Sequence, residues 1–235
     1  MGGTLYIVAT PIGNLKDISF RAVETLKAAD LIACEDTRRT AILLNTYGVT
    51  TPTTSYHAYS GPEKLRRLVE AIRGGKRVAL VSDAGLPGIS DPGTALVQAA
   101  VVEGLPVEVV PGASASLTAL VLSGLPTARF TFEGFLPVKP GPRRRRLETL
   151  RDEGRTAIVY ESPHRLLKTL ADIEAVYEDV PMSCSRELTK KFEETRRGRV
   201  SELHAHFAQH APRGEFVLIF TPRPHGGTGA RGHGR

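Results

Sequence analysis

The sequence has little of what marks several large classes of protein. Its 235 residues include only two cysteines, Cys34 and Cys184, which are too few for a four-cysteine zinc site or a disulfide-rich scaffold. No apolar run is long enough to span a bilayer, and residues 1–8 lack the basic and apolar regions of a secretion signal. The histidines are scattered and predict no metal site. We therefore expect a protein of the reducing cytoplasm, without a membrane partner.

Common catalytic and nucleotide-binding signatures are also missing. The sequence has no G-x-x-x-x-G-K-[ST] segment and no strand-linked G-x-G-x-x-G, which argues against P-loop enzymes and dinucleotide-dependent dehydrogenases. Residues 112–116 come close to the G-x-S-x-G elbow of serine hydrolases, but Ser116 replaces the last glycine. No later histidine follows a late strand in a suitable loop, so a serine hydrolase is disfavoured.

What is present fits a soluble, basic protein. Hydrophobic residues make up 41% of the chain and charged residues 24%, and the length suits one large domain or two modest ones. The formal net charge is +6, with basic residues concentrated at 143–146 and 190–199. Such segments suit a polyanionic partner such as RNA, although each is also compatible with an ordinary solvated surface.

Strand-like and helix-like segments alternate through the first half of the sequence. Apolar runs predict strands at 5–9, 31–34, 53–57, 78–81 and 107–110, and amphipathic segments predict helices between them. Ser19 is expected to cap the first of these helices. This alternation predicts a mostly parallel sheet with helices on both faces.

The second half has adjacent strands without helices between them, which predicts a mixed sheet with helices. We expect strands at 130–136, 156–160, 182–188, 192–200 and 216–220, a turn-rich connector at 137–142, and helices near 147–150, at 163–176 and at 201–207. The fold class is therefore α/β with two domains, 1–123 and 124–222. The segment 223–235 is rich in Gly, His and Arg and is expected to be a disordered basic tail.

Three loops rich in glycine and proline follow predicted parallel strands. They lie at 10–14, 81–93 and 111–114, and the carboxyl ends of parallel strands are where ligands bind in open α/β sheets. Glycine lets a backbone approach a ligand closely. The three loops together therefore predict a ligand site on one sheet edge. Within the second loop, Asp91, which precedes Pro92 and Gly93, is the expected cap of the next helix.

Three charged segments also follow predicted strands, at 34–39, 161–165 and 186–191. Acidic residues after Cys34 are compatible with the start of a helix, where they complement its dipole. Pro163 likewise fits a helix start. Charges in and after a strand at 186–191 are costly if buried and indicate a site or an exposed edge.

The segments 10–14, 34–38, 82–93, 111–114, 161–165 and 186–191 occur together and in order. On these segments the chain resembles the tetrapyrrole methylase superfamily, the class III S-adenosylmethionine-dependent methyltransferases, from Leu5 to about Pro222. Within it, the chain is similar to members that modify small-subunit ribosomal RNA. The turn Pro11-Ile12-Gly13-Asn14 replaces the Gly-Pro-Gly-Asp-type turn of the tetrapyrrole members, which favours an RNA substrate.

The resemblance implies two α/β domains with S-adenosyl-L-methionine in the cleft between them. It also implies methylation of the ribose 2′-hydroxyl of a decoding-site cytidine in 16S ribosomal RNA, so the partner would be the small ribosomal subunit or its rRNA. A homodimer is expected. The alternatives are a small-molecule, tetrapyrrole-type methyltransferase of the same fold and a non-catalytic RNA-binding module.

Carried over by motif, the cofactor contacts would be Pro11, Asp83, Leu86, Ser114, Ala115, Glu161 and Glu187. A ribose hydroxyl needs a general base or a cation that lowers its pKa, and the polar groups expected near the site are Glu35, Asp36, Glu187 and Lys190. Phosphates would be held by Arg143, Arg144, Arg145, Arg146, Lys190 and Lys191.

Overall fold

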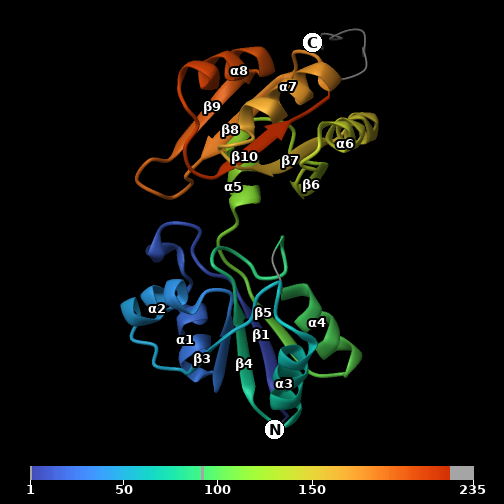
Figure 1. Ribbon diagram of the computed structural model, residues 1–235. Helices are drawn as coiled ribbons and strands as arrows, with labels where there is room; N and C mark the ends of the chain where they lie inside the picture. Colours follow the sequence, from blue (N-terminus) through green and yellow to red (C-terminus); the bar gives the residue numbers. More distant parts are fainter. Residues whose placement is uncertain (1, 91–92, 223–235) are drawn as a thin grey trace, which may run out of the picture. The chain divides into compact units, whose positions relative to one another are not determined.

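The computed structural model describes residues 2–90 and 93–222, and the chain divides into two compact units, Met1–Ala115 and Ser116–Arg235 (Figure 1). The expected disordered tail at 223–235 and the expected helix cap at Asp91 lie outside the described residues. Helix α5 (Ala115–Ser123) groups with the second unit, whereas the sequence places it at the end of the first domain. None of the described helices is long and apolar enough to cross a membrane.

The first unit is built on a parallel sheet of five strands. These are β1 (Thr4–Val8), β2 (Leu31–Cys34), β3 (Thr53–Ser55), β4 (Arg77–Val81) and β5 (Val107–Val110). Their order is β3-β2-β4-β1-β5, and all four neighbouring pairs are parallel. The prediction of a parallel sheet from alternating strands and helices is confirmed.

Helices cover both faces of this sheet. They are α1 (Phe20–Ala28), α2 (Thr37–Thr46), α3 (Pro62–Arg73) and α4 (Gly93–Val102), with a short 3₁₀ helix η1 (Leu15–Asp17) before α1. One core cluster joins α3 and α4 to side chains such as Leu5 and Leu80, and another joins α1 and α2 to Val8 and Val81. The two faces follow from the alternation of side chains along a strand. Ser19 caps α1 as predicted, accepting a hydrogen bond from the Ala22 N–H.

The second unit has a mixed sheet, as predicted. Its strands are β6 (Phe130–Phe135), β7 (Thr156–Glu161), β8 (Pro181–Arg186), β9 (Glu194–Arg199) and β10 (Phe216–Phe220). The order is β6-β7-β10-β8-β9, and only β6 and β7 pair in parallel. One face packs against α6 (Pro140–Glu153), α7 (Leu166–Tyr177) and α8 (Val200–Gln209).

The predicted connector at 137–142 is wrong in its second half, because α6 begins at Pro140. Proline is tolerated in the first turn of a helix, where its missing N–H has no intrahelical partner to lose. The prolines at 140 and 142 therefore start this helix. The helix predicted at 163–176 begins three residues later, at Leu166, so Pro163 lies in the turn before α7 and not in its first helical turn.

Candidate functional site

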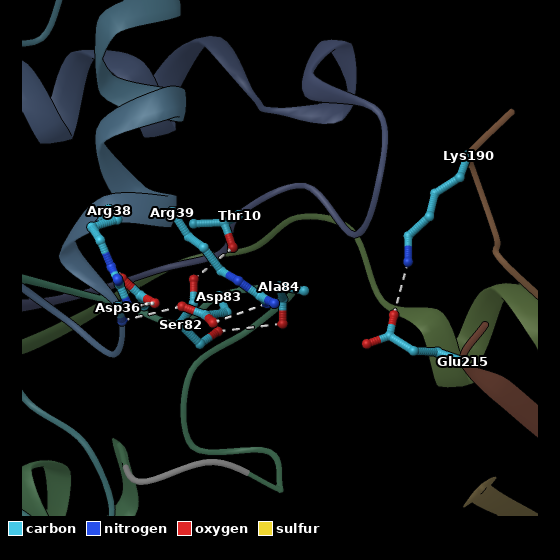
Figure 2. A network of polar contacts seen from close by, with 9 residues as sticks. All are labelled: Thr10, Asp36, Arg38, Arg39, Ser82, Asp83, Ala84, Lys190 and Glu215. Atoms are coloured by element: carbon cyan, nitrogen blue, oxygen red, sulfur yellow. Dashed lines mark hydrogen bonds and ion pairs between the residues drawn. The ribbon is translucent and has the colours of Figure 1, made fainter. Parts of the chain in front are cut away.

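The loops after β1 and β4 are joined at the carboxyl edge of the first sheet. Thr10 and Gly85 exchange two backbone hydrogen bonds, with N···O distances of 2.9 and 3.1 Å. The buried hydroxyl of Thr10 also donates to the Ser82 carbonyl at 3.1 Å (Figure 2). These bonds hold the β4 loop in one shape beside the first strand. Thr10 was not among the predicted site residues, although it lies in the 10–14 segment.

The third loop, after β5, approaches so closely that only glycine fits. A Cβ atom on Gly112 would lie 2.9 Å from the Cβ of Ala9, and one on Gly85 would lie 3.5 Å from the Ala113 carbonyl oxygen. Gly85 also has φ +80°, a conformation that a residue with a side chain rarely adopts. All three predicted loops therefore meet at this edge.

The strand order reverses direction at this edge, as it does at the ligand sites of open α/β sheets. From β1 the chain runs toward β2 on one side of the sheet, and from β4 it runs toward β5 on the other. Because crossovers are right-handed, the helices after β1 and β4 lie on opposite faces. In open α/β sheets, ligands bind between the loops that follow two such strands. Here those loops contain Thr10, after β1, and Gly85, after β4.

Asp83 is the central charged group of this edge. Its Oδ1 accepts a hydrogen bond from the Asp36 N–H at 3.2 Å, and its Oδ2 lies 3.2 Å from the guanidinium of Arg39 (Figure 2). The side chain is 23% exposed. A carboxylate oxygen can accept more than one hydrogen bond, so Asp83 is fixed in position and still able to accept from a ligand. Arg39 was not predicted, although it ends the 34–39 segment.

Asp36 serves as a helix cap. Its Oδ1 accepts from the Arg38 N–H at 2.8 Å at the start of α2. That backbone hydrogen bond, with the Arg38 guanidinium, holds the pKa of the Asp36 carboxyl below its ordinary value. A carboxylate with a lowered pKa is a weak base, so the structure disfavours Asp36 as a general base. Glu35 lies beside it and is half-buried.

The other cofactor residues predicted in the first unit lie on the same edge. Pro11 is buried next to Thr10, and Leu86 packs against the core beneath the β4 loop. Ser114 and Ala115 are half-buried where α5 begins, directly after Ala113.

In the second unit, Glu187 and Lys190 form a cluster with Glu215, which was not predicted. The Lys190 ammonium lies 3.1 Å from Glu187 Oε1 and 2.8 Å from Glu215 Oε2, the second contact being drawn in Figure 2. Glu187 Oε1 also accepts from the Glu215 N–H at 3.1 Å. A Cβ on Gly214, which has φ +85°, would lie 2.5 Å from the Glu187 side chain, so a glycine is needed beside this cluster.

The cluster fixes the charge of both predicted catalytic residues. Partial burial lowers the pKa of Lys190, but its hydrogen bonds with Glu215 and Glu187 outweigh burial and raise the pKa above its ordinary value. Partial burial raises the pKa of Glu187, but the Glu215 N–H and Lys190 outweigh it and lower the pKa. Lys190 is therefore a cation at neutral pH and not a base, and Glu187 is a weak base.

Glu161 lies in the interior of the second unit. It is 1% exposed, its Oε2 accepts from the Thr169 hydroxyl at 2.5 Å, and its Oε1 accepts from the Ser162 N–H at 2.8 Å. Arg165 lies 3.4 Å from the same Oε1. Both oxygens are engaged by neighbouring residues, so the geometry gives Glu161 a structural role instead of the expected cofactor contact.

The four arginines at 143–146 do not act as one basic surface. Arg143 is 3% exposed and pairs with the buried Asp172, so the prediction that it holds RNA phosphates is wrong. Arg144 also pairs with Asp172, and Arg146 pairs with Glu133. Arg145 is exposed, with no ion pair to the described residues. A helix turns by about 100° per residue, so four consecutive side chains cannot share one face.

The described residues contain no cluster of three His, Cys, Asp or Glu side chains that would hold a metal ion. Cys34 and Cys184 are both buried and reduced, and burial raises the pKa of each thiol. Neither metal ligation nor thiol chemistry is therefore indicated in this part of the chain.

Residues 4–204 match the family described as Tetrapyrrole (Corrin/Porphyrin) Methylases. A protein named Ribosomal RNA small subunit methyltransferase I from Synechocystis sp. is 49% identical over 92% of this chain and 78% of its own length. A protein of the same name from Thermotoga maritima is 46% identical over 93% of this chain and 98% of its own.

Solved structures share the fold at lower identity. Diphthine synthase superposes with a TM-score of 0.74 at 17% identity, covering 94% of this chain and 90% of that one. Cobalt precorrin-4 methyltransferase, a cobalamin biosynthetic enzyme, superposes with a TM-score of 0.66 at 20% identity, covering 92% and 94%.

Proposed function

The chain belongs to the tetrapyrrole methylase family, whose methyl donor is S-adenosylmethionine, and we propose that it methylates small-subunit ribosomal RNA at the ribose 2′-hydroxyl of a decoding-site cytidine. The RNA substrate is supported by the 46–49% identity, over more than nine-tenths of this chain, to proteins named Ribosomal RNA small subunit methyltransferase I. The net charge of +6 is consistent with a polyanionic substrate.

The residues at the edge of the first sheet fit S-adenosylmethionine. The cofactor has ribose hydroxyls that donate hydrogen bonds, and Asp83 offers a fixed, part-exposed carboxylate to accept them. Gly85 and Gly112 let the three loops pack closely together, which fixes the backbone that would line the cofactor. We assign Pro11, Asp83, Leu86, Ser114 and Ala115 to hold it.

The bound cofactor supplies an electrophilic methyl group on a sulfonium. The protein has to bring a ribose hydroxyl into line with it and ease the loss of the hydroxyl proton. Asp36 and Glu187 are disfavoured as bases, so Glu35 is the predicted group left to accept the hydroxyl proton, and we assign the cationic Lys190 to stabilise negative charge on the attacking oxygen. Glu187 and Glu215 position its ammonium.

We further propose that the protein acts in the cytoplasm as a homodimer. Leu117 and Val121 support this, because they lie one turn apart on α5 and are 51% and 75% exposed. Adjacent exposed apolar side chains on a helix offer a surface that a second copy of the chain would cover.

Incubation with methyl-labelled S-adenosylmethionine and unmodified small ribosomal subunits tests the proposed activity. We expect label in the RNA at the 2′-oxygen of one cytidine, mapped by nuclease digestion and mass spectrometry. Parallel reactions with naked small-subunit RNA and with a tetrapyrrole precursor separate the alternatives. Label on a base, or on the tetrapyrrole alone, would contradict the proposal.

Replacing Asp83 by asparagine is expected to weaken S-adenosylmethionine binding about 10- to 100-fold, because hydrogen bonds to a charged acceptor contribute roughly 1.5–3 kcal/mol. Isothermal titration calorimetry measures the effect. Asp30→Asn is the matched control: Asp30 also pairs with an arginine, Arg77, but at the amino end of β4. Equal losses in the two variants would show that Asp83 acts only through stability.

A further inference from the structure

The hairpin between β8 and β9 presents an aromatic ring that the proposed chemistry leaves unused. Phe192 lies in the loop that joins these strands and is 66% exposed. The Nζ atom of the neighbouring Lys191 lies 5.5 Å from the centre of its ring. A single exposed apolar side chain is common on protein surfaces, so its meaning depends on the shape and charge around it.

Hydrogen bonds fix the backbone of the loop that carries this ring. The Lys190 N–H donates to the Glu187 carbonyl at 3.0 Å, and the Glu193 N–H donates to the Lys190 carbonyl at 3.1 Å. The Thr189 N–H donates to Glu193 Oε2 at 2.6 Å. Glu187 and Thr189 have φ of +49° and +65°, which costs about 1–2 kcal/mol per residue in a residue with a side chain. Backbone held in such conformations is concentrated at functional sites.

The charges around the ring are mostly positive. Residues 186–199 contain six basic and three acidic side chains. The three acids are engaged within or beside the loop: Glu187 by Lys190, Glu194 by Arg186, and Glu193 by a backbone N–H. Lys191 is exposed and has no ion pair to the described residues. Along β9, the guanidinium of Arg197 donates to the carbonyl of Leu122 and has no ion pair with the described residues, so its charge is not neutralised there.

An exposed ring beside free cations is the arrangement that binds unpaired bases. Aromatic side chains stack on bases in single-stranded RNA, while lysines and arginines hold the adjoining phosphates. We propose that Phe192 is a stacking platform for an unpaired base of the RNA substrate, with Lys191 on the neighbouring phosphate. The inference rests on the proposed RNA substrate, because it assigns a residue that binds that substrate. A stacking surface favours RNA whose bases are unpaired, because only an unpaired base can place its face on an aromatic ring.

The chain contains no tryptophan, so a Phe192→Trp variant carries a single fluorescent reporter at the proposed contact. We expect a short oligouridylate to quench this fluorescence and the same strand in a duplex to quench it less. Phe20→Trp is the matched control, because Phe20 is 92% exposed and lies in the other unit, at the start of α1. Its fluorescence should not respond to the RNA.

Affinity gives the second measurement. Phe192→Ala should raise the Kd for oligouridylate about 5- to 100-fold, the range produced by losing one stacked base, with S-adenosylmethionine binding unchanged. Phe192→Leu keeps the apolar bulk without the aromatic face and should lose affinity similarly. Thermal unfolding checks that both variants are folded.

Three results would overturn the inference: Phe192→Ala binding RNA as tightly as the unaltered chain, no quenching in Phe192→Trp, or equal quenching by polyglutamate at the same ionic strength. Both assays are independent of turnover. A chain that binds RNA through Phe192 but transfers no methyl group would therefore contradict the proposed activity alone.

Discussion

Replacing Lys190 by methionine is expected to lower kcat for methyl transfer about 10²- to 10³-fold, the usual effect of removing one group that stabilises developing negative charge. The ammonium of Lys190 is held by Glu187 and Glu215 at 3.1 and 2.8 Å, so it does not have to reorganise during the reaction. Single-turnover measurements with saturating RNA isolate this effect from RNA binding. S-adenosylmethionine affinity should stay unchanged.

The pH dependence separates a fixed cation from a base. The pKa of Lys190 is raised above its ordinary value of 10.5, so its charge is fully present below that pH and is lost only as the pH rises through the higher, folded-state value. The rate should therefore show no fall from this group between about pH 7 and pH 10. If Lys190 were a base, the rate would instead rise throughout that interval as the amine lost its proton.

Two further variants complete the test of Lys190. Lys190→Arg keeps the positive charge and should retain part of the rate. Lys168→Met removes an exposed lysine from α7 and should leave kcat unaltered. If Lys190→Met transferred methyl groups as fast as Lys168→Met, the assignment of Lys190 would be wrong.

Asp172→Asn should destabilise the second unit by about 3–5 kcal/mol, because breaking a buried ion pair leaves an unneutralised charge in the interior. Asp172 Oδ2 lies 2.5 Å from the Arg143 guanidinium, and the two side chains are 4% and 3% exposed. Oδ1 also accepts from Arg144 at 2.6 Å. Urea unfolding followed by circular dichroism measures the loss.

The control for this pair is Asp152→Asn. Asp152 pairs with Arg151 on the surface and is 71% exposed, so its replacement should change stability by less than about 1 kcal/mol. The double variant Arg143→Met with Asp172→Leu removes both charges and should be more stable than Asp172→Asn alone. If Asp172→Asn had the same free energy of unfolding as Asp152→Asn, the Arg143–Asp172 pair would not contribute to stability.

Most helices and strands could be predicted from the sequence, because the residue patterns that specify them are local. The strands at 31–34, 107–110 and 216–220 have the predicted bounds, since each is a short apolar run between turn residues. The loops that gather at the first sheet edge were predictable too, because parallel strands necessarily end on the same side. The family resemblance rested on these loops together with the charged segments at 34–38, 161–165 and 186–191, because their order along the chain is visible in the sequence.

The roles of individual charges were not predictable in the same way. Arg143 reads as part of a basic run, but its partner Asp172 is 29 residues away. Glu161 reads as a site residue after a strand, yet Thr169 and Ser162 satisfy both of its oxygens. The sequence thus predicted an RNA contact for Arg143 and a cofactor contact for Glu161, whereas both side chains lie in the interior.

The sequence by itself determined the two α/β units, the family and the sheet edge where the glycine-rich loops end, because strand periods, turn residues and motif order are properties of neighbouring residues. The tertiary structure alone decided which charges are available to a ligand. Asp83 is fixed by groups 44 and 47 residues earlier, and Lys190 is paired with Glu215, 25 residues later. Burial and the distance between opposite charges set the charge state and exposure of each group, and both quantities exist only once distant segments have come together.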